Sequence, residues 1–196
     1  NIYLQFNSPI LVSKSGARQQ GRSALQNKGD KVIDSNIMDT LREEVKSELI
    51  NQEGRYNPSD RDVNVRIVED IRIAIDELAD GVIPSAQHIA EVAIATNENV
   101  QIRDFLMGVR LEKDINFVGE YISLLGNVVV KEKAIPLATI FCGYLYEAEE
   151  KEYASEFLNT ILETNPDYSL AKLLRRVFDA EWPASEFRKM AEHLHP

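Results

Sequence analysis

Apolar residues recur every three or four positions from residue 34 onward, a spacing that places them on one face of an α-helix. Ser35 is a favourable helix-capping residue just ahead of the first such stretch, and Gly54 predicts its end. The apolar positions between them are Ile37, Leu41, Val45 and Leu49. The pattern predicts an amphipathic helix.

The region after Asn57-Pro58 is ambiguous at first, because Val63, Val65 and Ile67 alternate as they would in a strand. Over the longer span to Leu78 the spacing fits a helix, which Gly81 would end. Ser59 and Asp62 form a weak capping-box pattern at its start.

Three further helices are predicted in the middle of the chain. Pro84-Ser85 opens one that runs to about Thr96, Asn97 starts the next, and a third begins near Asp114 and ends at Gly126-Asn127. Residues 128–130 are all valine, which fits a short strand and a connection between helices equally well.

The last third is divided by prolines. Pro136 is expected to begin an apolar helix that reaches about Tyr146, and a second helix follows a charged turn. Asn165-Pro166 ends that second helix, because proline lacks an amide hydrogen and restricts the residue before it. Trp182-Pro183 separates a third helix from a final one.

Taken together, these elements predict an all-α fold of stacked helical hairpins. Residues 133–166 have the length of one tetratricopeptide unit, with the small residue Ala154 where two helices would pack closely. The Trp-Leu-Gly part of that signature is absent. We therefore expect a tetratricopeptide-like, right-handed array over residues 34–196, preceded by a polar arm or loop at residues 8–33.

Residues 1–7 resemble a protease-cleavage linker used in recombinant expression, whose sequence is Asn-Leu-Tyr-Phe-Gln-Ser-Asn. A linker remnant would carry no biological message.

The segment Asn165-Pro166-Asp167-Tyr168-Ser169-Leu170-Ala171-Lys172-Leu173-Leu174 resembles the closing block of the actinobacterial domain-of-unknown-function family 4192. A weaker similarity lies at residues 100–106, and the resemblance extends over about residues 75–194. It departs at Asn165, where the family usually has Asp, and at Glu181-Trp182-Pro183, where the family tends to have Gly-Leu-Pro. The resemblance implies a helical fold and a bacterial, actinobacterial source, and it implies no mechanism.

The charge and cysteine content of the chain limit the partners and the cellular location that we expect. The formal net charge of −10 argues against non-specific nucleic-acid binding and against an anionic membrane surface, since both need clustered basic residues. Cys142 is the single cysteine and lies in an apolar run, so a buried, inert thiol and a cytoplasmic location are expected.

No catalytic, cofactor or metal site is predicted. The glycines stand alone instead of forming a phosphate loop, and His88 with Glu91 lacks the second Glu/His pair that a helical metal site needs. We expect His88 to lie on a helix surface. Arg103 with Asp104 is expected to make a local ion pair, and Tyr168 to pack between hairpins with its hydroxyl bonded.

Two classes of function remain open. The first is a protein or peptide interaction module, with Tyr144, Tyr146, Arg103 and Trp182 as the partner surface if they share an exposed face. The alternative is the helical half of a larger enzyme or nucleotide-handling protein, whose chemistry would lie in an N-terminal α/β half. The oligomeric state is not predicted.

Overall fold

The structure, a computed structural model, describes residues 3, 4, 6, 35–109 and 115–194, and within them it is helical apart from turns and one isolated bridge. This confirms the all-α fold class. The helices are α2 (Ser35–Gln52), α3 (Arg61–Ala79), α4 (Ala86–Glu98), α5 (Val100–Gly108), α6 (Ile115–Val128), α7 (Lys131–Glu147), α8 (Lys151–Thr164), α9 (Ser169–Asp179) and α10 (Ala184–Glu192).

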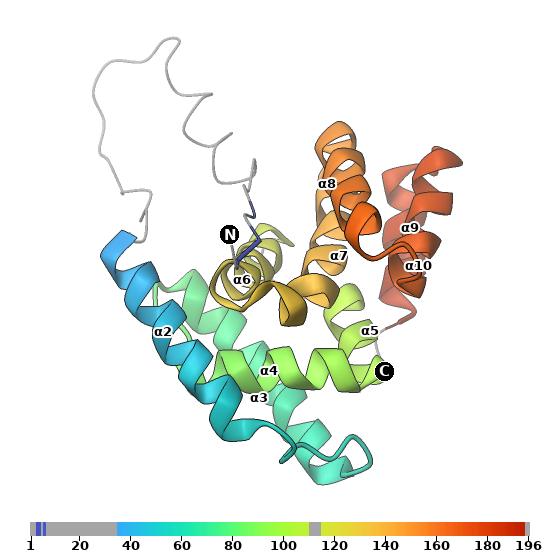
Figure 1. Ribbon diagram of the computed structural model, residues 1–196. Helices are drawn as coiled ribbons and strands as arrows, with labels where there is room; N and C mark the ends of the chain where they lie inside the picture. Colours follow the sequence, from blue (N-terminus) through green and yellow to red (C-terminus); the bar gives the residue numbers. More distant parts are fainter. Residues whose placement is uncertain (1–2, 5, 7–34, 110–114, 195–196) are drawn as a thin grey trace, which may run out of the picture.

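The helices form two groups on either side of a central pair (Figure 1). Helices α2, α3 and α4 lie at one end of the molecule, and α8, α9 and α10 lie at the other. Helices α6 and α7 pack against each other between these groups, and α7 also contacts α4, α5, α8, α9 and α10. The core therefore surrounds α7.

Helix α7 is buried on all sides, and every residue from Ala134 to Glu147 is covered. Its start differs from the prediction, because the helix begins at Lys131 and Pro136 lies inside it. A proline there removes one amide hydrogen, and only the carbonyl of Glu132 loses its usual helical partner. Extensive burial of the surrounding apolar residues offsets that loss.

Two predicted helix starts lie slightly too early. Asp60, and not Ser59, caps α3, because its carboxylate accepts hydrogen bonds from the amides of Asp62 (3.1 Å) and Val63 (3.2 Å). Asn99, and not Asn97, caps α5. The Asn97 side chain instead donates to backbone carbonyls within the body, so it is not available as a cap.

The predicted ends at Gly54, Gly81 and Asn165-Pro166 are confirmed, whereas the helix predicted to end at Gly126-Asn127 continues to Val128. Gly54 and Gly81 follow α2 and α3 with φ of +70° and +89°, the left-handed conformation that glycine adopts without strain. Helix α8 stops at Thr164, immediately before Asn165-Pro166, and α9 begins at Ser169. Val128 is the last residue of α6, residues 129–130 connect α6 to α7, and Val130 forms an isolated antiparallel bridge with Tyr3.

No helix among the described residues combines the length and apolar character needed to cross a membrane. The polar arm predicted at residues 8–33 lies outside the described residues.

Candidate functional site

The two tyrosines of the predicted partner surface are in the core. Tyr144 is 3% exposed and donates its hydroxyl to the carbonyls of Leu106 (2.8 Å) and Val109 (3.2 Å). Tyr146 is 2% exposed, stacks on Phe178 with 4.3 Å between ring centroids, and donates to the carbonyl of Trp182. The two tyrosines therefore do not meet the condition of an exposed face on which their place in a partner surface depends, because the residues of α7 from Ala134 to Glu147 are buried.

The other two residues of that surface behave differently. Trp182 is 40% exposed, whereas Arg103 is mostly covered and donates two hydrogen bonds to one carboxylate oxygen of Asp104, at 2.8 and 3.0 Å. The local Arg103–Asp104 pair is thus confirmed. The four predicted residues do not form a shared exposed patch.

Arg103 and Tyr168 line a hollow of about 420 Å³ together with Glu98, Glu132 and Asn165. Tyr168 packs against the core as predicted, but its buried hydroxyl makes no hydrogen bond of good geometry with any residue that the structure describes. Burial raises the pKa of this phenol, and the positive charge of Arg103 opposes that rise. Because Arg103 is already paired with Asp104, Glu98 and Glu132 give the hollow a net negative lining, which disfavours anions.

His88 is half-buried instead of lying on an open helix surface, and its Nε2 is 2.8 Å from the hydroxyl of the buried Tyr121. It lines a second hollow, of about 460 Å³, that also contains Arg66 and Glu91. Arg66 is paired with Glu91 and with Asp70, so its charge is already neutralised. Within the described residues no group of three or more His, Cys, Asp or Glu is placed to hold a metal ion.

His88 makes the stability of the fold depend on pH. Burial lowers its pKa, and the carboxylates of Asp70, Glu91 and Glu77 only partly oppose this. The folded state therefore favours the neutral ring, and stability is expected to fall as pH drops below about 6.5, the pKa of an unfolded histidine. The loss is about 1.4 kcal/mol for each tenfold difference in proton affinity between the two states. Urea unfolding of the wild type and of His88→Gln between pH 5 and 8 measures it. A pH dependence unchanged by the substitution would contradict this assignment.

Cys142 is fully buried, as predicted, and burial raises the pKa of its thiol far above the ordinary value. Because the thiolate is the reactive form, alkylation by iodoacetamide is expected to occur only on unfolding. Mass spectrometry of the native protein at pH 8 is expected to show no adduct over an hour, whereas protein in denaturant labels fully. An adduct formed on the native protein within minutes would contradict the burial of this side chain.

A second candidate site holds Phe6, which is far in sequence from the helices that surround it. The ring of Phe6, which is only 5% exposed, lies between Phe141 of α7 and Phe157 of α8, with ring centroids at 5.5 and 5.3 Å. The third wall is Gly126 of α6, where a Cβ would overlap the Phe6 ring. We call the space bounded by Gly126, Phe141 and Phe157 the Phe6 slot.

Asn127 holds the backbone of the same residue. Its side-chain oxygen accepts the Phe6 amide at 2.9 Å, and its side-chain nitrogen donates to the Phe6 carbonyl at 3.2 Å. That nitrogen also donates to the carbonyl of Ser123 at 3.0 Å, so the side chain is oriented by its own helix. One carboxamide therefore satisfies both backbone polar groups of Phe6.

Three residues earlier, Tyr3 forms the bridge with Val130. The guanidinium of Arg42, on α2, lies 5.3 Å from the Tyr3 ring centroid. Arg42 also donates through Nε to the backbone carbonyl of Asn127 at 3.0 Å. We refer to the Phe6 slot with Arg42, Asn127 and Val130 as the docking surface. The described part of the N-terminal segment, which includes Tyr3 and Phe6, lies beside α6 (Figure 1).

Sequence reasoning did not find the docking surface. In the sequence, Gly126-Asn127 predicts a helix end, and residues 1–7 resemble a linker. A signal was present in the glycine, because α6 continues through Gly126 to Val128, and a glycine inside a helix often marks a close approach.

The chain matches no family model, no curated protein and no solved structure. The resemblance of residues 165–174 to family 4192 therefore remains a prediction.

Proposed function

We propose that this protein is a peptide-binding module and that its docking surface takes an extended segment of a partner protein. The observation that carries the proposal is the paired hydrogen bonding of Asn127 to the amide and carbonyl of Phe6. These groups occur in every peptide, so such a contact suits recognition of an extended chain. The aromatic slot adds an anchor for one side chain.

The contacts support a general peptide ligand even if residues 1–7 derive from a linker. Asn127 contacts only backbone, and the Phe6 slot contacts only a phenyl ring. A segment of another protein that presents a phenylalanine in an extended backbone would offer the same groups.

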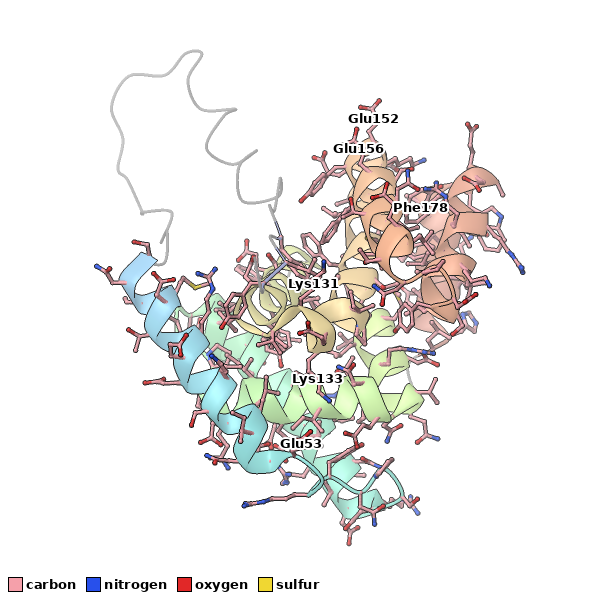
Figure 2. The ribbon with its side chains drawn as sticks, in the orientation of Figure 1. Glu53, Lys131, Lys133, Glu152, Glu156 and Phe178 are labelled. Carbon is pink, nitrogen blue, oxygen red and sulfur yellow. The ribbon has the colours of Figure 1, made fainter. Side chains whose placement is uncertain are left out.

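The surrounding charge favours a neutral or basic partner. The chain carries a formal net charge of −10. Glu152 and Glu156 are exposed on α8, the helix that supplies Phe157, and they project outward from the molecule (Figure 2). Opposite charges on a partner would speed its encounter with this face.

The finer architecture, a tetratricopeptide-like array, is part of the proposal. Helices α7 and α8 pack together as a hairpin across a short turn, and Ala154 is fully buried, as close packing of two helices requires. In such a hairpin, Phe141 and Phe157 form two walls of a binding surface.

Binding in trans tests the proposal. In the full chain, the double substitution Tyr3→Ala/Phe6→Ala removes the side chains that fill the surface; we call this protein the vacated chain. A fluorescein-labelled peptide with the sequence of residues 1–7 is titrated and followed by polarisation. We expect saturable binding with a Kd on the order of 1–100 μM. The wild-type chain is expected to bind at least about tenfold more weakly, because its own tethered segment competes at a high effective concentration.

Two asparagine variants provide the matched control, both made in the vacated chain. Asn127→Ala removes two hydrogen bonds to the peptide and is expected to weaken binding about 10- to 100-fold. Asn97→Ala removes hydrogen bonds to Ala93 and Lys133 within the body and is expected to leave binding unchanged. No binding to the vacated chain at about 1 mM peptide, together with no rise in its melting temperature, would overturn the proposal.

A further inference from the structure

We infer that the docking surface selects a four-position motif: an aromatic residue first, an apolar residue second and phenylalanine fourth, running antiparallel to residues 127–130 of the body. The inference rests on the proposed function and specifies its ligand. In this chain the three positions are occupied by Tyr3, Leu4 and Phe6.

Direction and spacing follow from two backbone anchors. Tyr3 is bridged to Val130 in the antiparallel sense, and Phe6 is held by Asn127. The segment therefore advances from Tyr3 to Phe6 while the body runs back from Val130 to Asn127, three residues in each case. A ligand of reversed direction could not place its amide and carbonyl on Asn127 while keeping its first side chain near Val130.

The first position favours a flat ring. The Arg42 guanidinium is fixed over the Tyr3 ring by two bonds, one to the carbonyl of Asn127 and one to the carboxylate of Asp39 at 2.8 Å. A guanidinium held in this way attracts the face of an aromatic ring. Arg42 contacts the first position and also donates to the backbone carbonyl of Asn127, which holds the fourth position. The two residues that recognise the ends of the motif are therefore in direct contact.

The same position excludes a negative charge. The Tyr3 hydroxyl is buried and finds no hydrogen-bond partner among the residues that the structure describes. Burial and the carboxylates of Glu43 and Asp39 disfavour a negative charge on this hydroxyl, and the positive charge of Arg42 only partly opposes them. Phenylalanine is therefore expected to bind at least as well as tyrosine, and phosphotyrosine to be rejected.

The side chains at the second and fourth positions differ in how deeply they are buried. Leu4 is partly buried against the core, so this position is expected to accept various apolar side chains. Phe6 is almost fully enclosed, with rings on two sides and the Gly126 backbone on the third. A smaller side chain would lose these ring contacts and leave a cavity.

A panel of variants of the residue 1–7 peptide tests the motif by polarisation on the vacated chain. We expect Tyr3→Phe to bind as well as the parent or better. Tyr3→Ala is expected to bind about tenfold more weakly, and the peptide phosphorylated at Tyr3 at least about tenfold more weakly. Phe6→Leu is expected to lose about tenfold and Phe6→Ala more than about a hundredfold. A peptide of reversed sequence is expected not to bind.

The substitution Arg42→Gln tests whether Arg42 recognises the aromatic ring at the first position. In the vacated chain with Arg42→Gln, the loss caused by Tyr3→Ala in the peptide is expected to shrink to under about threefold, because the cation that contacts the ring is gone. A loss of the same size in both bodies would overturn the assignment of Arg42.

The outcomes separate the motif from the proposed function. Equal binding of the parent, Tyr3→Ala and reversed peptides would overturn the motif while the module still binds peptides. Failure of every peptide to bind would overturn the proposed function and the motif together.

Discussion

Gly126→Ala is expected to close the Phe6 slot while leaving the helix around it intact. The added methyl group would overlap the ring of Phe6. Position 126 lies inside α6, where alanine is favoured over glycine by roughly 0.8–1 kcal/mol. In the vacated chain we therefore expect peptide binding to weaken at least about a hundredfold and stability to stay equal or rise. Polarisation titration and urea unfolding measure the two effects on the same protein.

The opposite signs of these two effects make the prediction specific. A variant that merely misfolds would lose both binding and stability. Unchanged binding of the residue 1–7 peptide by the Gly126→Ala chain would mean that the ring does not occupy the space beside Gly126.

Phe6→Ala in the otherwise unaltered chain is expected to lower the free energy of unfolding by about 3 kcal/mol. Truncation of a buried phenylalanine typically costs 3–5 kcal/mol, and the lower end applies here because the segment can detach instead of leaving a cavity. Urea unfolding followed by far-ultraviolet circular dichroism measures the change.

Trp182→Ala is a control for loss of an aromatic ring. Trp182 is 40% exposed, and its bond to Tyr146 is made by its backbone carbonyl, so we expect a change of less than about 1 kcal/mol. If Phe6→Ala changed stability no more than Trp182→Ala, the Phe6 ring would not be docked in solution.

The helices could be predicted from sequence where local signals decide them. Apolar periodicity identified α3 and the glycine after it, and Asn165-Pro166 marked the boundary between α8 and α9. The prediction that Pro136 begins α7 is wrong. Proline favours the first turn of a helix, but here burial of the apolar residues around it offsets the cost of a proline inside the helix, and the local sequence does not show that burial.

Tyr144 and Tyr146 illustrate a limit of a different kind. The sequence around them is apolar on every helical face, which is the pattern of a fully buried helix. The backbone carbonyls that accept from their hydroxyls belong to distant segments of the chain. Nothing local indicates that Leu106 of α5 and Val109, just after it, supply the carbonyls that accept from Tyr144.

The docking surface could not be predicted because it depends on contact between positions 121 residues apart. Asparagine is common at the ends of helices, so Asn127 gives no local sign of a binding role. Phe6 lies in a stretch whose apolar residues show no helical or strand periodicity. Only the packing of α6, α7 and α8 brings Gly126, Phe141 and Phe157 around one ring.

The most direct test of the central claim is a comparison of Phe6 and Phe6→Leu peptides on the vacated chain and on the same chain with Gly126→Ala. With Gly126 present, the phenylalanine peptide is expected to bind about tenfold more tightly than the leucine peptide. With Gly126→Ala, the shorter leucine side chain is expected to be tolerated better, and the preference to reverse. A preference for phenylalanine of the same size on both chains would contradict the account that Gly126 forms a wall of the peptide-binding slot.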